Sequence, residues 1–243
     1  MRDSPQVLEV WGDFACYSRP ELKVERFSYP VPTPSSVRGI FDAIYVKPTE
    51  FRWQVAKIEV LNQPAYIALR RNEVKDVVNV NAVAKWMEGK QEPEPLWADG
   101  DRELLGSDEK GRTQRQTMAL RNVRYRLWAS VRPWPGFEGR HDAFVAQFRR
   151  RAERGKCFFQ PYFGCREFPA WFRLADPEPT SPTDTFDLDV GWMLYDVFDL
   201  SRPGGCHDGP AISLFRAQVR QGVLDVPAYD STEVYKHSVA GGG

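Results

Sequence analysis

The sequence is poor in the residues and runs that mark many common protein classes. It has four cysteines and three histidines among 243 residues, and no apolar run approaches the roughly 20 residues that a membrane-spanning helix needs. The N-terminus, Met1-Arg2-Asp3-Ser4-Pro5, lacks the apolar core of a signal peptide. We therefore expect a cytoplasmic protein with reduced thiols and no membrane partner.

Motifs of common cofactor-dependent and hydrolytic enzymes are absent as well. The sequence contains no G-x-G-x-x-G, P-loop, H-E-x-x-H or G-x-S-x-G pattern. Cys157 and Cys165 are eight residues apart, and Cys206-His207 adds two further potential zinc ligands, but no C-x-x-C pair occurs. We expect no cofactor and no metal site.

The net charge of zero hides an uneven distribution of charge. The segment 111–132 contains six arginines and no acidic residue, whereas the chain from Leu174 to its end has eleven acidic and four basic residues. A basic segment of this kind is typical of proteins that bind a polyanion such as RNA, although a solvated surface has the same pattern.

The hydrophobic pattern predicts an α+β fold. Strand patterns and helix patterns alternate along the first two thirds, and the order predicts a ferredoxin-like (RAMP/RRM-like) βαββαβ domain over residues 1–172. Strand patterns in the last third predict a small antiparallel β-sheet domain over residues 173–243 with a disordered tail from Val239. The expected strands are 7–15, 51–61, 65–69, 121–132, 188–200, 212–219 and 223–226; the expected helices are 34–46, a short one at 81–87 within an insertion at about 75–111, and 142–154.

Capping residues define the two longer helices. Thr33 suits the N-cap of the first helix, Pro34 suits its first turn, and Val37, Ile40, Phe41 and Ile44 form its apolar stripe. Asp142 is the expected N-cap of the last helix, and Gly155 its stop.

Arginines and aromatic residues on the predicted surface are candidate RNA contacts. The alternation in the strand 121–132 places Arg124, Arg126 and Trp128 on the face opposite its apolar residues, where bases can stack and cations can meet phosphates. A half-exposed strand with arginines for solubility fits equally well. The candidate RNA-binding residues are Arg38, Arg121, Arg124, Arg126, Trp128, Arg149, Arg150, Arg151 and Arg154, with Phe158 and Phe159 as further stacking groups.

A histidine next to an arginine begins the last predicted helix, in the segment Gly139-Arg140-His141. Free amide N–H groups at a helix start favour an anion such as a phosphate. A solvated basic helix with an incidental histidine has the same pattern. Tyr45, near the end of the first helix, has the pattern of a half-buried tyrosine at the edge of the core.

Six segments together resemble one known family, the type I-C CRISPR-associated RAMP protein, which is subtype d of the fifth Cas family. The resemblance runs from about residue 7 to 226 and implies a ferredoxin-like domain followed by a smaller β-sheet domain. It also implies an endoribonuclease that processes CRISPR repeat RNA to crRNA and stays in the Cascade complex with its backbone and large subunits. The segments are 10–13, 35–40, 43–48, 70–74, 119–123 and 164–169.

The resemblance also implies a cleavage site. In this family a tyrosine after the first helix and a Gly-Lys-His element form the site; here they correspond to Tyr45 and Gly139-Arg140-His141, with arginine in place of lysine. The implied reaction is a metal-independent attack by a ribose 2′-OH, in which His141 transfers protons, Tyr45 orients the hydroxyl and Arg140 stabilises charge. Two alternatives remain open: an inactive subunit that binds the crRNA 5′ handle, and an RNA-binding module unrelated to CRISPR.

Overall fold

The computed structural model describes residues 4–22, 24–75, 77–93, 111–176, 185–203 and 210–236. The chain divides into two compact units: residues 1–67 with 118–243, and residues 68–117. The predicted boundary between residues 172 and 173 stays a prediction, as does the tail from Val239, which lies outside the described residues along with Cys206-His207.

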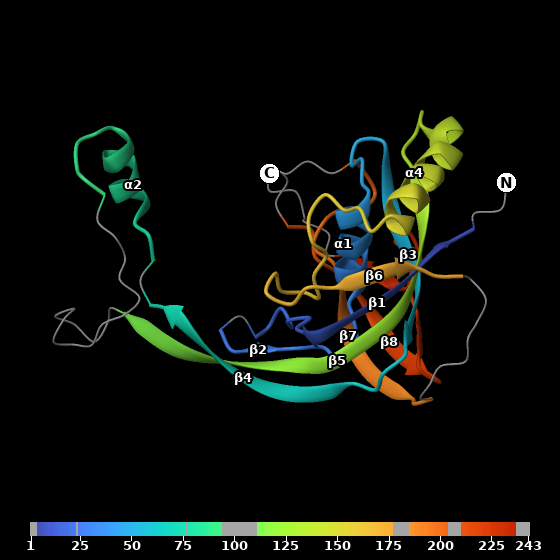
Figure 1. Ribbon diagram of the computed structural model, residues 1–243, viewed down its shortest axis with the longest axis horizontal. Coiled ribbons are helices and arrows are strands. Elements are labelled where there is room, and N and C mark those ends of the chain that lie inside the picture. Colours follow the sequence, from blue (N-terminus) through green and yellow to red (C-terminus); the bar gives the residue numbers. More distant parts are fainter. Residues whose placement is uncertain are drawn as a thin grey trace. The chain divides into compact units, whose positions relative to one another are not determined.

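An antiparallel sheet carries the fold (Figure 1). Its strand order is β10-β8-β9-β3-β5-β1-β6, with β2 and β4 also pairing with β5, and β7 with β8. The α+β class is therefore confirmed. In chain order the elements are β1 (Gln6–Ala15), β2 (Arg26–Phe27), α1 (Pro34–Ile44), β3 (Phe51–Val60), β4 (Ala65–Val74), α2 (Val80–Met87), β5 (Arg112–Pro133), the 3₁₀ helix η1 (Glu138–Arg140), α4 (His141–Glu153), β6 (Trp171–Leu174), β7 (Leu188–Asp196), β8 (Ser213–Arg220), β9 (Val223–Asp225) and β10 (Val234–Lys236).

The start of α1 is as predicted. The Thr33 hydroxyl accepts a hydrogen bond from the Ser36 amide at 3.2 Å, and Pro34 is the first helical residue. The helix ends at Ile44, two residues earlier than predicted, because Tyr45 has an extended backbone. The predicted apolar stripe is buried against the sheet.

The helix α4 begins one residue earlier than predicted, and the assignment of Asp142 as its N-cap is wrong. Arg140 occupies the cap position without a side-chain hydrogen bond, and Asp142 lies inside the first turn. The Asp142 carboxylate contacts the His141 ring instead. Gly155 ends the helix at a positive φ of 64°, as predicted.

The strands around the predicted insertion are longer than expected. β4 continues to Val74 instead of ending at Leu69, and β5 begins at Arg112 instead of Arg121. The two strands pair with each other, so ladder hydrogen bonds stabilise polar segments that hydrophobic alternation alone left unassigned. The short helix within the insertion, α2, is confirmed at Val80–Met87.

The two faces of the central sheet differ in chemistry. On one face, the centroid of the Trp53 ring on β3 lies 5.0 Å from that of Phe41 on α1 and 4.7 Å from that of Phe148 on α4. Both helices therefore cover this face. A register shift between Val55 and Lys57 interrupts β3. The opposite face carries charged residues of β1, β3, β5 and β6. No helix in the described part of the chain is long and apolar enough to span a membrane.

Candidate functional site

Tyr45 lies directly after α1 and is held by its backbone. Its amide donates to the Phe41 carbonyl at 2.9 Å, and its carbonyl accepts from the Trp53 indole N–H at 2.8 Å. The phenol ring lies 5.6 Å from the Phe51 ring, centroid to centroid, and the residue is only 7% exposed. The position of this side chain is therefore set by α1 and β3 together.

Arg140 ends η1, immediately before α4. Its Nη1 lies 2.6 Å from a carboxylate oxygen of Glu50, and its guanidinium carbon lies 5.2 Å from the centroid of the Phe144 ring. The side chain is 52% exposed, so most of the guanidinium remains accessible to solvent. The ion pair orients this cation without burying it.

His141 is the first residue of α4. Its Nδ1 lies 3.1 Å from the Asp142 carboxylate, and its side chain is partly exposed. A carboxylate at Nδ1 favours the tautomer that carries the proton there. The pair therefore has the groups that acid–base chemistry needs.

A row of aromatic contacts connects Tyr45 with Arg140. The Phe51 ring, which contacts Tyr45, stacks on the Phe144 ring with 4.8 Å between centroids. The Arg140 guanidinium lies over that same Phe144 ring. The end of α1 and the start of α4, far apart in the sequence, thus share one aromatic cluster.

Three predicted RNA contacts are engaged within the fold. Arg38 binds both carboxylate oxygens of Asp196, at 2.8 and 3.0 Å, and also pairs with Asp42. Arg126 pairs with Glu59 and is buried. Trp128 is also buried, and the Lys57 ammonium lies 3.7 Å from the centroid of its ring. These residues have partners from neighbouring strands or helices, which the sequence pattern did not identify.

The arginines of α4 divide into two groups. Arg151 donates from Nε to the Ile44 carbonyl at 2.6 Å and lies over the Phe158 ring, so it ties α4 to the end of α1. Arg149 contacts Gln6 at 3.3 Å. Arg150, which bonds Gln147, and Arg154, at the end of the helix, are exposed. Arg121 and Arg124 of β5 are exposed as well.

Cys165, one of the candidate zinc ligands, contacts an arginine and a backbone carbonyl. The Cys165 sulfur accepts from Arg26 at 3.3 Å and lies 3.6 Å from the Cys16 carbonyl oxygen. Among the residues that the structure describes, no cluster of three or more His, Cys, Asp or Glu side chains is arranged to hold a metal ion.

Comparison with known proteins identifies the family. The model of a family described as "CRISPR-associated protein (Cas_Cas5)" matches residues 7–227. A protein of Mannheimia succiniciproducens named CRISPR pre-crRNA endoribonuclease Cas5d is 38% identical over 234 residues, which cover 93% of this chain and 96% of the relative. The chain belongs to the Cas5d family. A Thermus thermophilus protein of the same name is 36% identical over 241 residues, 94% of each chain.

A solved structure supports the fold of this Cas5d chain. The structure, described as a CRISPR-associated protein, has a TM-score of 0.62 at 19% identity and covers 95% of this chain and 96% of its own. The family model and the two relatives confirm the family resemblance carried by the six sequence segments.

Sequence reasoning missed several residues that surround the predicted ones. Glu50, which binds Arg140, gave no sequence signal beyond its place after Lys47-Pro48. Trp11 lies in a segment that carried the Cas5d resemblance, yet its exposure on the sheet was not predicted. Arg173 likewise had no pattern of its own. Contacts between strands, rather than periodicity, reveal these residues.

Proposed function

We propose that this chain is a CRISPR pre-crRNA endoribonuclease that cleaves repeat RNA hairpins and remains bound to the crRNA 5′ handle in Cascade, beside the backbone and large subunits. The observation that carries the proposal is the match to two relatives of that name over 93% and 94% of this chain. An RNA-binding module unrelated to CRISPR has no comparable support.

The core of the fold is, in this proposal, ferredoxin-like. Six elements, β1-α1-β3-β5-α4-β6, follow the βαββαβ order, and the four strands are arranged β3-β5-β1-β6 with antiparallel neighbours. The strands β7 to β10 form the smaller antiparallel part. This arrangement supports the proposal because it brings the end of α1 and the start of α4 to the same aromatic cluster.

The proposed reaction is an internal transesterification of the RNA. The 2′ oxygen next to the scissile phosphate forms a bond to phosphorus, and the bond from phosphorus to the 5′ oxygen breaks. The products are a 2′,3′-cyclic phosphate and a free 5′-OH, so one proton leaves the 2′-OH and one joins the 5′ oxygen. No water and no metal enters this scheme.

His141 is the proton-transfer group in this scheme. An imidazole takes up and releases protons near neutral pH, and its position at the start of α4 leaves the ring partly exposed. Tyr45 orients the 2′-OH or assists the transfer, because a phenol is a weak base. Its tightly fixed backbone supports an orienting role.

Arg140 stabilises the pentacoordinate phosphate. A guanidinium has five N–H donors in a planar fork, and the contact with Glu50 is made through Nη1. The remaining donors of this exposed side chain are available to a phosphate. The amide N–H groups of the first turn of α4 favour negative charge in the same region.

Cleavage of a labelled CRISPR repeat hairpin in EDTA, under single-turnover conditions, tests the function. We expect His141→Ala and Tyr45→Phe to cut about 100- to 1000-fold more slowly, the typical cost of losing one such group, and to bind the RNA as tightly as the parent protein. Arg220→Ala, on β8, serves as the charge-altering control and should cleave normally. A 2′-deoxy substitution 5′ of the cut should abolish cleavage.

Two results would contradict this assignment. A His141→Ala protein that cuts at the parent rate would remove His141 from the mechanism. A parent protein that binds the repeat hairpin tightly but leaves it intact would instead identify a handle-binding subunit without activity.

A further inference from the structure

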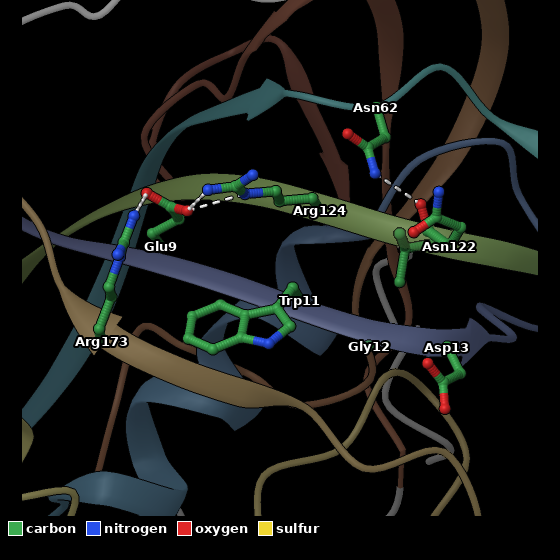
Figure 2. Close-up of a pocket in the computed structure, with 9 residues that line it drawn as sticks. Glu9, Trp11, Gly12, Asp13, Asn62, Asn122, Arg124 and Arg173 are labelled. Carbon is green, nitrogen blue, oxygen red and sulfur yellow. Dashed lines mark hydrogen bonds and ion pairs between the residues drawn. The ribbon is translucent and has the colours of Figure 1, made fainter.

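A hollow lies on the sheet face opposite α1 and α4. Its volume is about 360 Å³, within the range of small-ligand sites of roughly 300–1,000 Å³. Strands β1, β5 and β6 and the loop after β3 supply its walls (Figure 2). The residues are Glu9, Trp11, Gly12, Asp13, Asn62, Asn122, Val123, Arg124 and Arg173.

Strand register places an exposed indole on the face of the sheet that carries this hollow. Trp11 is directly opposite Arg124 on β5 and Trp171 on β6, so the three side chains lie on one face of the sheet. Trp11 is 37% exposed and Trp171 is 55% exposed. An exposed tryptophan on a central strand offers a flat surface for a planar ligand.

A shared carboxylate orients two guanidinium groups beside that indole. Glu9 accepts from Arg124 Nε at 2.8 Å and from Arg173 Nη2 at 2.9 Å (Figure 2). Burial acts to raise the pKa of Glu9, but the hydrogen bonds from both arginines lower it overall, so the carboxylate is ionised at neutral pH. The three groups keep one net positive charge, and the Arg124 and Arg173 side chains are 47% and 60% exposed.

The other end of the hollow has unoccupied hydrogen-bonding groups. Asn122 interrupts β5 with a positive φ of 52°, and the Asn62 side chain locks this backbone by donating to the Asn122 carbonyl at 2.8 Å. Within the described residues, no hydrogen bond engages the side-chain amide of Asn122 or the carboxylate of Asp13. Both groups line the hollow on the side of Trp11 that faces away from Glu9 and Arg173 (Figure 2).

We propose that this hollow binds one unpaired guanine base of single-stranded RNA. Proteins recognise single-stranded RNA by stacking splayed bases on aromatic rings and bonding their edges, with arginines on the backbone. Here Trp11 stacks on the base, and Arg124 and Arg173 hold the adjacent phosphate. The Asp13 carboxylate only accepts hydrogen bonds, and guanine alone presents two adjacent donors, N1–H and the N2 amino group, to it.

The inference rests on the proposed function, and it adds a specificity site on the opposite face of the sheet from the aromatic cluster of Tyr45. Its residues differ from those proposed for cleavage. The base it binds belongs to the single-stranded flank of the repeat, since Watson–Crick pairing already engages the N1–H and N2 amino donors of guanine that Asp13 would bind.

Fluorescein-labelled RNA octamers test the pocket by anisotropy. The series is U₈ and U₈ with one central position changed to guanosine, inosine or adenosine. We expect the guanosine octamer to bind about 10-fold more tightly than U₈, and inosine, which lacks the N2 amino group, to lose most of that gain. Asp13→Asn should abolish the preference for guanosine, so that the guanosine, inosine and adenosine octamers bind with equal affinity.

Tryptophan variants separate stacking from folding. Trp11→Ala should weaken binding of the guanosine octamer about 10-fold, and Trp11→Phe, which keeps an aromatic ring, about 3-fold or less. Trp192→Ala removes a comparably exposed tryptophan of β7 and should change nothing. Equal affinities for all four octamers would overturn the guanine assignment. Unchanged binding by Trp11→Ala would overturn the site and leave this face to a protein partner.

The cleavage assay distinguishes failure of the pocket from failure of the proposed function. If the parent protein leaves repeat hairpins intact but binds guanosine through Trp11, the pocket proposal holds and the proposed nuclease activity is excluded. If the protein cleaves repeats but the Trp11 and Asp13 variants bind the octamers as the parent does, the nuclease activity is supported and the pocket proposal is excluded.

Discussion

The guanidinium of Arg140 lies 2.6 Å from the carboxylate of Glu50, 90 positions earlier in the chain. The same carboxylate also pairs with Lys47 at 2.9 Å, and the Glu50 carbonyl accepts from the Trp134 amide. Glu50 therefore connects the segment after α1, the end of β5 and the start of α4. This contact fixes the direction of the arginine in the proposed cleavage site.

Loss of that carboxylate should separate catalysis from binding. In Glu50→Gln, Arg140 keeps its charge but loses its orienting partner, so we expect cleavage of a repeat hairpin to slow about 10-fold, since a positioned charge stabilises a transition state better than a mobile one. RNA affinity should stay equal or rise, because a negative charge is removed near the RNA. Single-turnover rates and filter binding measure the two effects.

The matched control is Glu233→Gln, an exposed carboxylate before β10. It makes the same change of charge without a contact to Arg140, and its cleavage rate should equal that of the parent. A Glu50→Gln protein with weaker RNA binding and an unchanged rate would assign Glu50 to the RNA contact surface.

Arg38 should prove to be a stability residue. Asp196 is only 1% exposed and receives two hydrogen bonds from Arg38, so Arg38→Ala leaves a buried carboxylate without its cation. Breaking such a pair costs about 3–5 kcal/mol of unfolding free energy. Urea denaturation should show this loss, whereas RNA affinity at a temperature where the variant is folded should change less than 2-fold, or about 0.4 kcal/mol.

Arg216→Ala provides the comparison, since Arg216 is exposed on β8 and lies over the Trp192 ring. Its unfolding free energy should change by less than about 1 kcal/mol. If Arg38→Ala were as stable as this control yet bound RNA 10-fold more weakly, Arg38 would be an RNA contact as the sequence first indicated.

Asp42 should give stability a specific pH dependence. Burial raises the pKa of Asp42 to about 6, against the opposing effect of Arg38. The folded state therefore binds this proton more tightly than the unfolded state, and the contribution to stability is fully present below about pH 4 and is lost as the pH rises through 6. The loss from this one group is about 3 kcal/mol.

Unfolding free energies of the parent and Asp42→Asn, measured from pH 4 to 8, isolate this group. The difference between the two proteins should change across pH 4–6 and become constant above about pH 7. Glu9, whose pKa is lowered, has the opposite sign: its contribution is present above the usual carboxyl pKa and is lost in acid. A pH-independent difference between the two proteins would show that Asp42 titrates normally.

Arg154, exposed at the end of α4, should contact an RNA phosphate and so contribute to the salt dependence of RNA affinity. Arg154→Ala should lower the slope of log affinity against log salt by about 0.7 to 0.9, the range from a single strand to duplex DNA for one phosphate contact. Arg151→Ala should instead lower the melting temperature, because Arg151 bonds the Ile44 carbonyl and packs on Phe158. Binding at several salt concentrations and thermal melts of both variants make the comparison. An unchanged salt slope in Arg154→Ala would exclude a phosphate contact there.

Local features were predictable because each depends on a few neighbouring residues. The Thr33 cap and Pro34 start of α1 follow from short-range hydrogen bonding and a fixed φ. The turn between β8 and β9 follows from Gln221-Gly222, where both residues take positive φ angles of 49° and 78°. Asp142 was misassigned because an N-cap also needs an extended backbone, which η1 prevents.

Features that depend on distant partners were not predictable. The alternation in β5 correctly separates its two faces, but it does not show that Glu59 and Lys57 of β3 meet Arg126 and Trp128. An arginine has the same pattern whether it faces solvent, RNA or a buried carboxylate. For this reason the predicted set of RNA contacts mixed structural arginines with exposed ones.

By itself, the sequence determined the longer elements and the family, since hydrophobic periodicity, capping residues and six short segments are all read along the chain; the short strands β2, β6 and β10 were not among the expected ones. Only the tertiary structure decided which charges are neutralised and which remain available. Burial and pairing arise between residues such as Arg38 and Asp196, 158 positions apart, and their energies depend on distance in space rather than along the chain.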